Sequence, residues 1–187
     1  MSIFHKSRRQ KYHTENSLRG IVRAARARKR VRRIVRGRSV RRWVRRWNEI
    51  DIDVTMTKDG VVVGNHWGRP LLKDGFIDPL GKISKQARIH ELTFAEVQRL
   101  HTRNGYRIRR LTVLLDACAK NGIGARVEPK VDKRFEDVET WLPIKAHADK
   151  VGCRIKGYSI RNLGGKGAGV RRVEAMKAAG IPAVPIH

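Results

Sequence analysis

The segment from Glu49 to His66 constrains the fold more than any other part of the chain. Its first half alternates apolar and acidic residues, a period that places Ile50, Ile52 and Val54 on one face of a strand and Glu49, Asp51 and Asp53 on the other. The tripeptide Lys58-Asp59-Gly60 follows, and Asp-Gly accommodates the positive φ angles of a tight turn. We therefore predict a β-hairpin whose return strand begins at 61–63 and ends near His66.

The rest of the chain alternates predicted helices and strands. A loop over 70–84 precedes a helix that Thr93 caps, with Glu96 three positions further on. The later helices are expected at 111–120, 142–151 and 170–179, and the later strands at 123–128, 153–160 and 182–186. This order is typical of a parallel α/β protein.

Positive charge is concentrated before the hairpin. The chain carries 43 Lys and Arg residues against 17 Asp and Glu, a formal charge of +26, and no acidic residue lies between Glu15 and Glu49. Apolar residues over 31–35 and 40–47 recur at three- and four-residue spacing, which predicts two short amphipathic helices in a basic insertion at about 19–47. We call this segment the basic arm; it contains Arg32, Arg33, Arg41, Arg42, Arg45 and Arg46.

The basic arm has several possible partners. Nucleic acid, anionic lipid surfaces and cell-wall phosphate polymers all attract a strongly cationic protein. The alternative interpretation is an exposed helical face that packs on the domain through its apolar stripe. Neither interpretation predicts sequence-specific recognition of nucleic acid.

Three carboxylates are candidate metal ligands. Asp51 and Asp53 share one strand face, and Glu128 lies on a later predicted strand, on the same face as Lys130. Neighbouring carboxylates need solvent or a cation to offset their repulsion, and Mg²⁺ or Ca²⁺ prefers carboxylate oxygen. A solvated strand edge is the alternative interpretation of the Asp-x-Asp pair taken alone.

Several motifs, in order, resemble those of the glycerophosphodiester phosphodiesterase family. That family shows His-Arg-Gly, Pro-Glu-Asn-Thr, Glu-x-Asp with Thr-x-Asp-Gly, His-Asp, and Glu-x-Lys. This chain has His5-Lys6, Glu15-Asn16-Ser17, Asp51-x-Asp53 with Thr57-Lys58-Asp59-Gly60, His66-Trp67, and Glu128-x-Lys130. Fainter likeness runs through 92–115 and 147–186, so the resemblance covers nearly the whole chain.

The resemblance implies a (β/α)8 TIM-type barrel and a divalent-metal phosphodiesterase. Such a barrel usually takes about 250 residues, so we expect a single domain over 1–187 whose fifth and sixth strand units are contracted or missing. By the same resemblance Asp51, Asp53 and Glu128 ligate one Mg²⁺ or Ca²⁺, and His5 and His66 act as general base and acid without assignment of which is which. Lys130 and Lys6 contact phosphate, with Arg8 or Arg9 compensating because Lys6 replaces the family's arginine.

These observations support two functional hypotheses. The first is hydrolysis of a phosphodiester (a glycerophosphodiester, a phospholipid-derived diester or a teichoic-acid-like polymer) to glycerol phosphate and an alcohol. The second is a catalytically weak scaffold that holds nucleic acid or another polyanion through the basic arm. Cys118 and Cys153 are expected to be buried free thiols, and the absence of an apolar export or membrane-spanning segment predicts a cytoplasmic or phage-associated protein.

Overall fold

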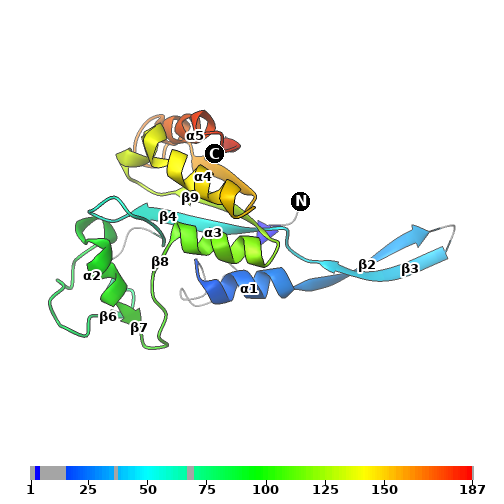
Figure 1. Ribbon diagram of the computed structural model, residues 1–187, viewed down its shortest axis with the longest axis horizontal. Helices are drawn as coiled ribbons and strands as arrows, with labels where there is room; N and C mark the ends of the chain where they lie inside the picture. The colour runs from blue at the N-terminus through cyan, green and yellow to red at the C-terminus, as the bar shows by residue number, and fades with distance from the viewer. Residues whose placement is uncertain (1–2, 5–15, 36–37, 67–69, 187) are drawn as a thin grey trace.

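The computed structural model describes residues 3–4, 16–35, 38–66 and 70–186. Strands follow one another over residues 28–77, and helices and strands alternate over residues 111–186 (Figure 1). In chain order they are β1 (Ile3–Phe4), α1 (Leu18–Arg26), β2 (Arg28–Val35), β3 (Arg38–Arg45), β4 (Glu49–Met56), β5 (Val62–Gly64), β6 (Phe76–Ile77), the 3-10 helix η2 (Ile89–Glu91), α2 (Phe94–Arg99), β7 (His101–Thr102), β8 (Arg109–Arg110), α3 (Leu111–Lys120), β9 (Gly124–Pro129), the 3-10 helices η3 (Lys133–Glu136) and η4 (Val138–Thr140), α4 (Leu142–Lys150), β10 (Ile155–Ile160), α5 (Ala168–Ala178) and β11 (Ala183–Ile186).

Seven strands of the described residues form one mixed sheet. The order is β11-β10-β9-β4-β5-β8, and β1 pairs with the beginning of β4. The pairs β1 to β4, β4 to β9, β9 to β10 and β10 to β11 are parallel, whereas β5 pairs antiparallel with β4 and β8. The predicted α/β class is therefore confirmed. Within the described ranges β11 and β8 remain at the two ends of the sheet, so the predicted barrel is not closed there.

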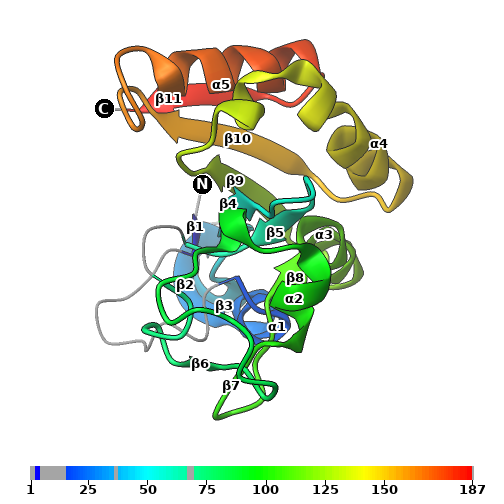
Figure 2. The same ribbon diagram turned by 90° about the vertical axis from the view of Figure 1, so that its left-hand side faces the viewer.

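The four longer helices that cover this sheet share one hydrophobic core with it. Residues of α1, α3, α4 and α5 pack with the apolar residues of β4, β9, β10 and β11. The alternating strand residues Ile50, Ile52 and Val54 all belong to this core, so the acidic residues between them face the other side of the sheet. Figure 2 shows α3, α4 and α5 following one another along one side of the strands. The opposite face is the one that carries the polar residues.

The hairpin predicted over Glu49 to His66 is confirmed. Val54 pairs with Gly64 and Met56 with Val62 across the antiparallel strands. In the turn, Thr57 Oγ1 donates a hydrogen bond to Asp59 Oδ1 at 2.6 Å, and Gly60 has a φ of 83°. That left-handed conformation is one that glycine adopts without steric cost, which explains the Asp-Gly pair.

The turn also positions a second, smaller hydrophobic cluster. Asp59 Oδ1 accepts a hydrogen bond from the backbone N–H of Phe94 at 2.9 Å, which ties the hairpin to the start of α2. The predicted cap of this helix is present, because Thr93 and Glu96 exchange side-chain to backbone hydrogen bonds. Phe94 then packs in a cluster of apolar residues drawn from β5 and from 71–108.

The prediction of two basic helices over about 19–47 is wrong for most of that segment. Only α1 is helical, whereas β2 and β3 pair antiparallel from Arg28 opposite Arg45 to Val35 opposite Arg38. The apolar residues of this arm are mainly Val, Ile and Trp, which favour extended backbone. The resulting hairpin projects away from the body of the protein (Figure 1).

Two further expectations concern the cysteines and the membrane. Cys118 and Cys153 are free and buried, as predicted. Hydrogen bonding with the Cys153 thiol, together with burial, raises the pKa of Cys118 above its ordinary value, so this sulfur stays protonated. Among the described residues, none of the helices combines the length and apolar character needed to cross a bilayer.

Candidate active site

The candidate site lies on the face of the sheet opposite α1, α3, α4 and α5. Asp51 and Asp53 project to this face from β4, because the residues between them belong to the core on the other side. Glu128 projects to the same face from β9, where Ala125 and Val127 belong to the core. The structure thus brings all three predicted carboxylates to one face of one sheet.

Asp53 and Glu128 are direct neighbours across two parallel strands. The register pairs Asp53 with Glu128. The ammonium of Lys130 lies 2.7 Å from Asp53 Oδ1 and 2.7 Å from Glu128 Oε2, and its side chain is only 5% exposed. The backbone N–H of Lys130 donates to Val54 O at 2.9 Å, which fixes the residue beside β4. One buried cation therefore joins the buried carboxylate of Glu128 to the partly buried carboxylate of Asp53.

Tyr158 on β10 completes this cluster. Its hydroxyl donates a hydrogen bond to Glu128 Oε2 at 2.8 Å. Burial raises the pKa of the Tyr158 phenol well above its ordinary value, and the nearby carboxylates of Asp51 and Glu128 raise it further. The phenol consequently remains a donor at neutral pH and fixes the orientation of the Glu128 carboxylate.

A ladder of charges surrounds this cluster on the same face. Lys156 Nζ pairs with Glu49 Oε1 at 2.9 Å, and Asp51 lies opposite Arg126 in the strand register. The guanidinium carbon of Arg126 lies 4.2 Å from the centroid of the Tyr158 ring. Arg126 contacts the ring of Tyr158 and Glu128 binds its hydroxyl, so Tyr158 links the ladder of charges to the buried cluster.

Two asparagines hold the main chain of Asp53. Asn16 Oδ1 accepts a hydrogen bond from Asp53 N at 2.9 Å, and Asn65 N donates to Asp53 O at 2.9 Å. Asp53 lies between the part of β4 that pairs with β1 and the part that pairs with β5. The Asn16 side chain therefore takes the place of a neighbouring strand there, and its φ of 55° lies in the left-handed region that asparagine tolerates.

The predicted histidines and phosphate-binding residues are only partly described. His66 follows β5, one residue after the Asn65 amide that binds Asp53, and it is exposed. Its role at this site stays a prediction. The other predicted residues, His5, Lys6, Arg8 and Arg9, lie outside the described residues.

Sequence reasoning missed two residues of the site, Tyr158 and Asn16. Tyr158 shares its strand face with Lys156, which alternation along β10 could have indicated once that strand was placed beside β9. Asn16 belongs to the Glu15-Asn16-Ser17 motif, but no role was predicted for its side chain, because its contact joins residues 37 positions apart in the chain.

The predicted metal site of Asp51, Asp53 and Glu128 stays a prediction. Among the described residues, no group of three or more His, Cys, Asp or Glu side chains is arranged to hold a metal ion. Lys130 lies between Asp53 and Glu128 instead. Two observations still fit a hard divalent cation: the donors are carboxylates, and Glu128 Oε1 is buried without a hydrogen-bond partner in the described part of the chain.

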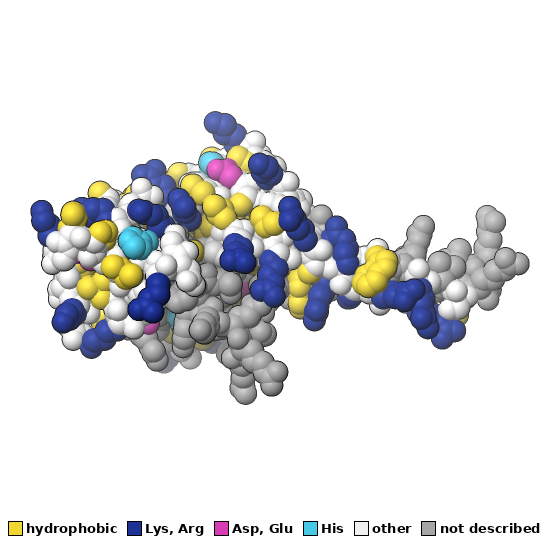
Figure 3. All heavy atoms as spheres, turned by 90° about the horizontal axis from the view of Figure 1, so that it is seen from below, with side chains coloured by type: hydrophobic (Ala, Val, Ile, Leu, Met, Phe, Trp, Pro, Cys, Tyr) yellow, Lys and Arg dark blue, Asp and Glu magenta, His cyan; other side chains and the backbone are white. Residues whose placement is uncertain are grey.

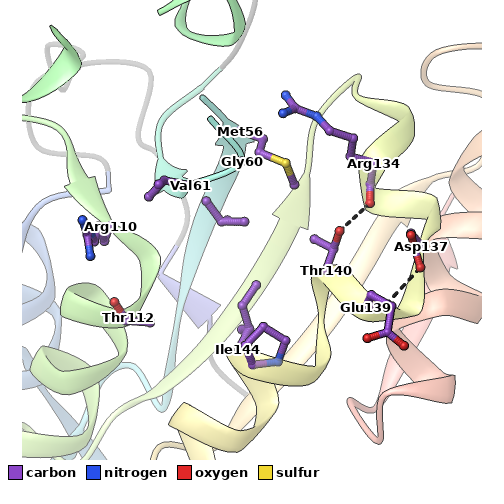
Figure 4. A pocket seen from close by; sticks show the side chains of 12 residues that line it. Met56, Gly60, Val61, Arg110, Thr112, Arg134, Asp137, Glu139, Thr140 and Ile144 are labelled. Atoms are coloured by element: carbon purple, nitrogen blue, oxygen red, sulfur yellow. Dashed lines mark hydrogen bonds between the residues drawn. The ribbon is translucent and has the colours of Figure 1, made fainter. Parts of the chain in front are cut away.

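A pocket of about 560 Å³ opens elsewhere, between the β4–β5 turn, the start of α3 and the start of α4 (Figure 4). Met56 in its wall belongs to the helix-side core together with Val54, so the pocket lies on the face opposite Asp53. Arg134, also in the wall, donates to Thr57 O at 2.9 Å and pairs with Asp132. Since its guanidinium already serves the fold, we assign this pocket no part in the acidic site.

Comparison with solved structures identifies the fold. A Galdieria sulphuraria protein described as a glycerophosphodiester phosphodiesterase superposes with a TM-score of 0.55 and 17% identity, over 74% of this chain and 52% of that one. The chain has the fold of the glycerophosphodiester phosphodiesterases. Glycerophosphodiester phosphodiesterases from Agrobacterium tumefaciens (TM-score 0.47, 15% identity, 71% and 51% coverage) and Parabacteroides distasonis (0.44, 18%, 60% and 43%) also match.

The fold of the glycerophosphodiester phosphodiesterases agrees with the resemblance seen in the sequence motifs. No protein-family model matches the chain, and no curated protein does either. The chain spans about half the length of the phosphodiesterase structures that it matches. Glu128 and Lys130 stand at the carboxyl end of β9.

Proposed function

We propose that the protein hydrolyses a phosphodiester of the glycerophosphodiester type to glycerol phosphate and an alcohol. The observation that carries this proposal is the cluster of Asp53, Glu128 and Lys130 on the sheet face opposite α1, α3, α4 and α5. Burying charged groups costs free energy, and here Glu128 and Lys130 are both buried beside the partly buried Asp53. Binding of an anionic substrate by Lys130 and of a cation by the two carboxylates would explain why these charged groups are placed together.

Lys130 supplies positive charge to the phosphate. Negative charge develops on the phosphoryl oxygens as the nucleophile attacks, and a fixed ammonium in a largely buried site stabilises it strongly. The contacts with Asp53 and Glu128 hold this ammonium in one place. Tyr158 in turn fixes Glu128, so that the group facing the substrate is positioned before the substrate arrives.

His66 is proposed as one of the two acid–base groups, with His5 as the other. One imidazole takes a proton from the attacking water or substrate hydroxyl, and the other returns a proton to the alkoxide that leaves phosphorus. The exposed position of His66 beside the Asp53 strand suits a group that exchanges protons with substrate and solvent. Lys6, Arg8 and Arg9 are proposed as further phosphate contacts.

A divalent cation, Mg²⁺ or Ca²⁺, is proposed to bind at the carboxylates. Asp53 and Glu128 would hold it, with Asp51 on the same strand face as the third ligand. Bound there, such an ion would offset charge on the phosphoryl oxygens. The carboxylate donors and the buried Glu128 Oε1 support this assignment.

The test is turnover of purified full-length protein on a panel of diesters. We expect a phosphomonoester to be released from glycerophosphocholine, lysophospholipid or a glycerol phosphate polymer in the presence of Mg²⁺ or Ca²⁺, and EDTA to abolish the release. His66→Ala should reduce the rate by about a hundredfold or more, the range of general acid–base catalysis. His90→Ala is the matched control, because His90 is exposed and lies outside the site. Absence of turnover on the whole panel, or turnover that resists both EDTA and His66→Ala, would contradict the proposal.

A further inference from the structure

The β2–β3 hairpin presents a separate charged surface. Residues at alternate positions of a strand, and residues directly opposite in an antiparallel pair, share a face. Arg30 lies opposite Trp43 and Arg32 opposite Arg41, so one face combines one indole with arginines from both strands. We call this surface the Trp43 face; its described members are Arg28, Arg30, Arg32, Ile34, Ser39, Arg41 and Trp43.

The cationic and aromatic groups of the Trp43 face are accessible. Trp43 is 68% exposed, and the guanidinium carbon of Arg30 lies 6.0 Å from the centroid of its ring. Arg30 and Arg41 are exposed and, within the described residues, form no ion pair with an acidic side chain. Figure 3 shows Lys and Arg side chains along the hairpin with a hydrophobic group among them. The hairpin therefore offers unneutralised positive charge beside an open aromatic ring.

We propose that the Trp43 face binds single-stranded nucleic acid. Arginines at alternate positions of β2 repeat at roughly 7 Å, which suits successive phosphates of an extended strand. An exposed indole between them provides a platform for an unstacked base, the combination by which sequence-tolerant single-strand binders work. A duplex keeps its bases stacked and has no free base for Trp43.

The arrangement favours nucleic acid over a membrane surface. The second exposed apolar residue on this face, Ile34, is separated from Trp43 by the Arg32 and Arg41 pair. A membrane-binding surface needs a continuous apolar face that enters the bilayer. Here the apolar groups are single and surrounded by guanidinium groups, which are suited to phosphates on either side of a base.

The aromatic platform is tested by fluorescence anisotropy with labelled single-stranded RNA or DNA and the matching duplex, using full-length protein. EDTA keeps any hydrolase activity silent, so this test does not depend on the proposed phosphodiesterase. We expect tighter binding to the single strand, about a tenfold loss of affinity in Trp43→Ala, and most of the affinity retained in Trp43→Phe. Circular dichroism checks that each variant is folded.

The charge contribution is tested by the salt dependence of the same affinity. Arg30→Gln with Arg41→Gln should lower the slope of log K against log salt by about 1.4, which is about 0.7 for each lost phosphate contact. Lys82→Gln with Lys85→Gln is the matched control, because both lysines are exposed in a distant loop and the loss of charge is equal. Its slope should equal that of the unsubstituted protein.

Three outcomes would overturn the inference. The first is an equal effect of the two double variants, which means that total charge alone decides binding. The second is duplex binding at least as tight as single-strand binding together with an unchanged Trp43→Ala affinity. The third is binding to phosphatidylglycerol vesicles with no binding to any oligonucleotide.

Discussion

Asp53 and Glu128 lie directly opposite each other on neighbouring parallel strands. The ammonium nitrogen of Lys130 lies 2.7 Å from a carboxylate oxygen of each. The two carboxylates would repel strongly in a buried site without this cation. Their separation along the chain means that the pairing depends on the whole sheet rather than on local sequence. The first prediction follows from this triad.

Replacing Lys130 with Met should destabilise the fold by about 3 kcal/mol, because removal of one partner leaves buried charge uncompensated. The measurement is urea unfolding at neutral pH. Lys145→Met serves as the control, since Lys145 pairs with Asp149, whose side chain is 61% exposed. We expect a loss within about 1 kcal/mol there. Equal losses in both variants would contradict the buried arrangement around Lys130.

Tyr158→Phe should cost about 2 kcal/mol, the value of a hydrogen bond to a charged group, while the ring over which Arg126 lies is retained. The matched control is Tyr106→Phe, which removes a hydrogen bond from Tyr106 to the neutral Asn16 carbonyl at 3.2 Å and should cost about 1 kcal/mol or less. Urea unfolding measures both. If phosphodiester turnover is found, Tyr158→Phe should also lower its rate. A Tyr158→Phe variant as stable as the unsubstituted protein would refute the assigned contact.

The lowered pKa of Asp59 predicts that this residue contributes to the loss of stability at acid pH. The hydrogen bond from Thr57 lowers the pKa of Asp59 below its ordinary value of 3.8, the Phe94 amide adds to this effect, and burial opposes it. Because the folded pKa is the lower one, Asp59 stabilises the fold above its unfolded pKa, and the contribution is lost as pH falls through the folded pKa. Asp59→Asn should therefore lose less stability than the unsubstituted protein between about pH 5 and pH 2. If chemical unfolding shows that both proteins lose the same free energy of unfolding over this pH range, Asp59 has no such effect.

Gly169 lies at a tight contact between α5 and the end of β10. A Cβ atom added at Gly169 would lie 2.0 Å from the backbone oxygen of Ile160 and 2.9 Å from Arg161 Cα, so Gly169→Ala forces the backbone to shift. We expect a loss of at least about 3 kcal/mol in thermal or urea unfolding. Glu174→Ala, at an exposed position of the same helix, should change stability by less than about 0.5 kcal/mol. A tolerated Gly169→Ala would mean that α5 lies further from β10.

The basic arm shows where sequence reasoning failed. The apolar residues of 31–35 and 40–47 satisfy a helical spacing, yet they form β2 and β3. Short apolar runs fit either period, and only pairing between the two strands resolves the ambiguity. That pairing gives the facing backbone groups of each strand hydrogen-bond partners in the other strand. By contrast, the strict alternation of Glu49 to Val54 and its Asp-Gly turn allowed one interpretation, which the structure confirms.

Local pattern alone determined which side chains share a face of β4, where the β4–β5 turn lies and where Thr93 caps α2, because backbone geometry sets these features within a few residues. Sequence also placed Asp51 and Asp53 together, and Glu128 with Lys130. Only tertiary structure decided that Lys130 reaches Asp53, that Tyr158 binds Glu128 and that Asn16 supports the Asp53 backbone. These contacts depend on strand order and register, which arise from packing between segments far apart in the chain.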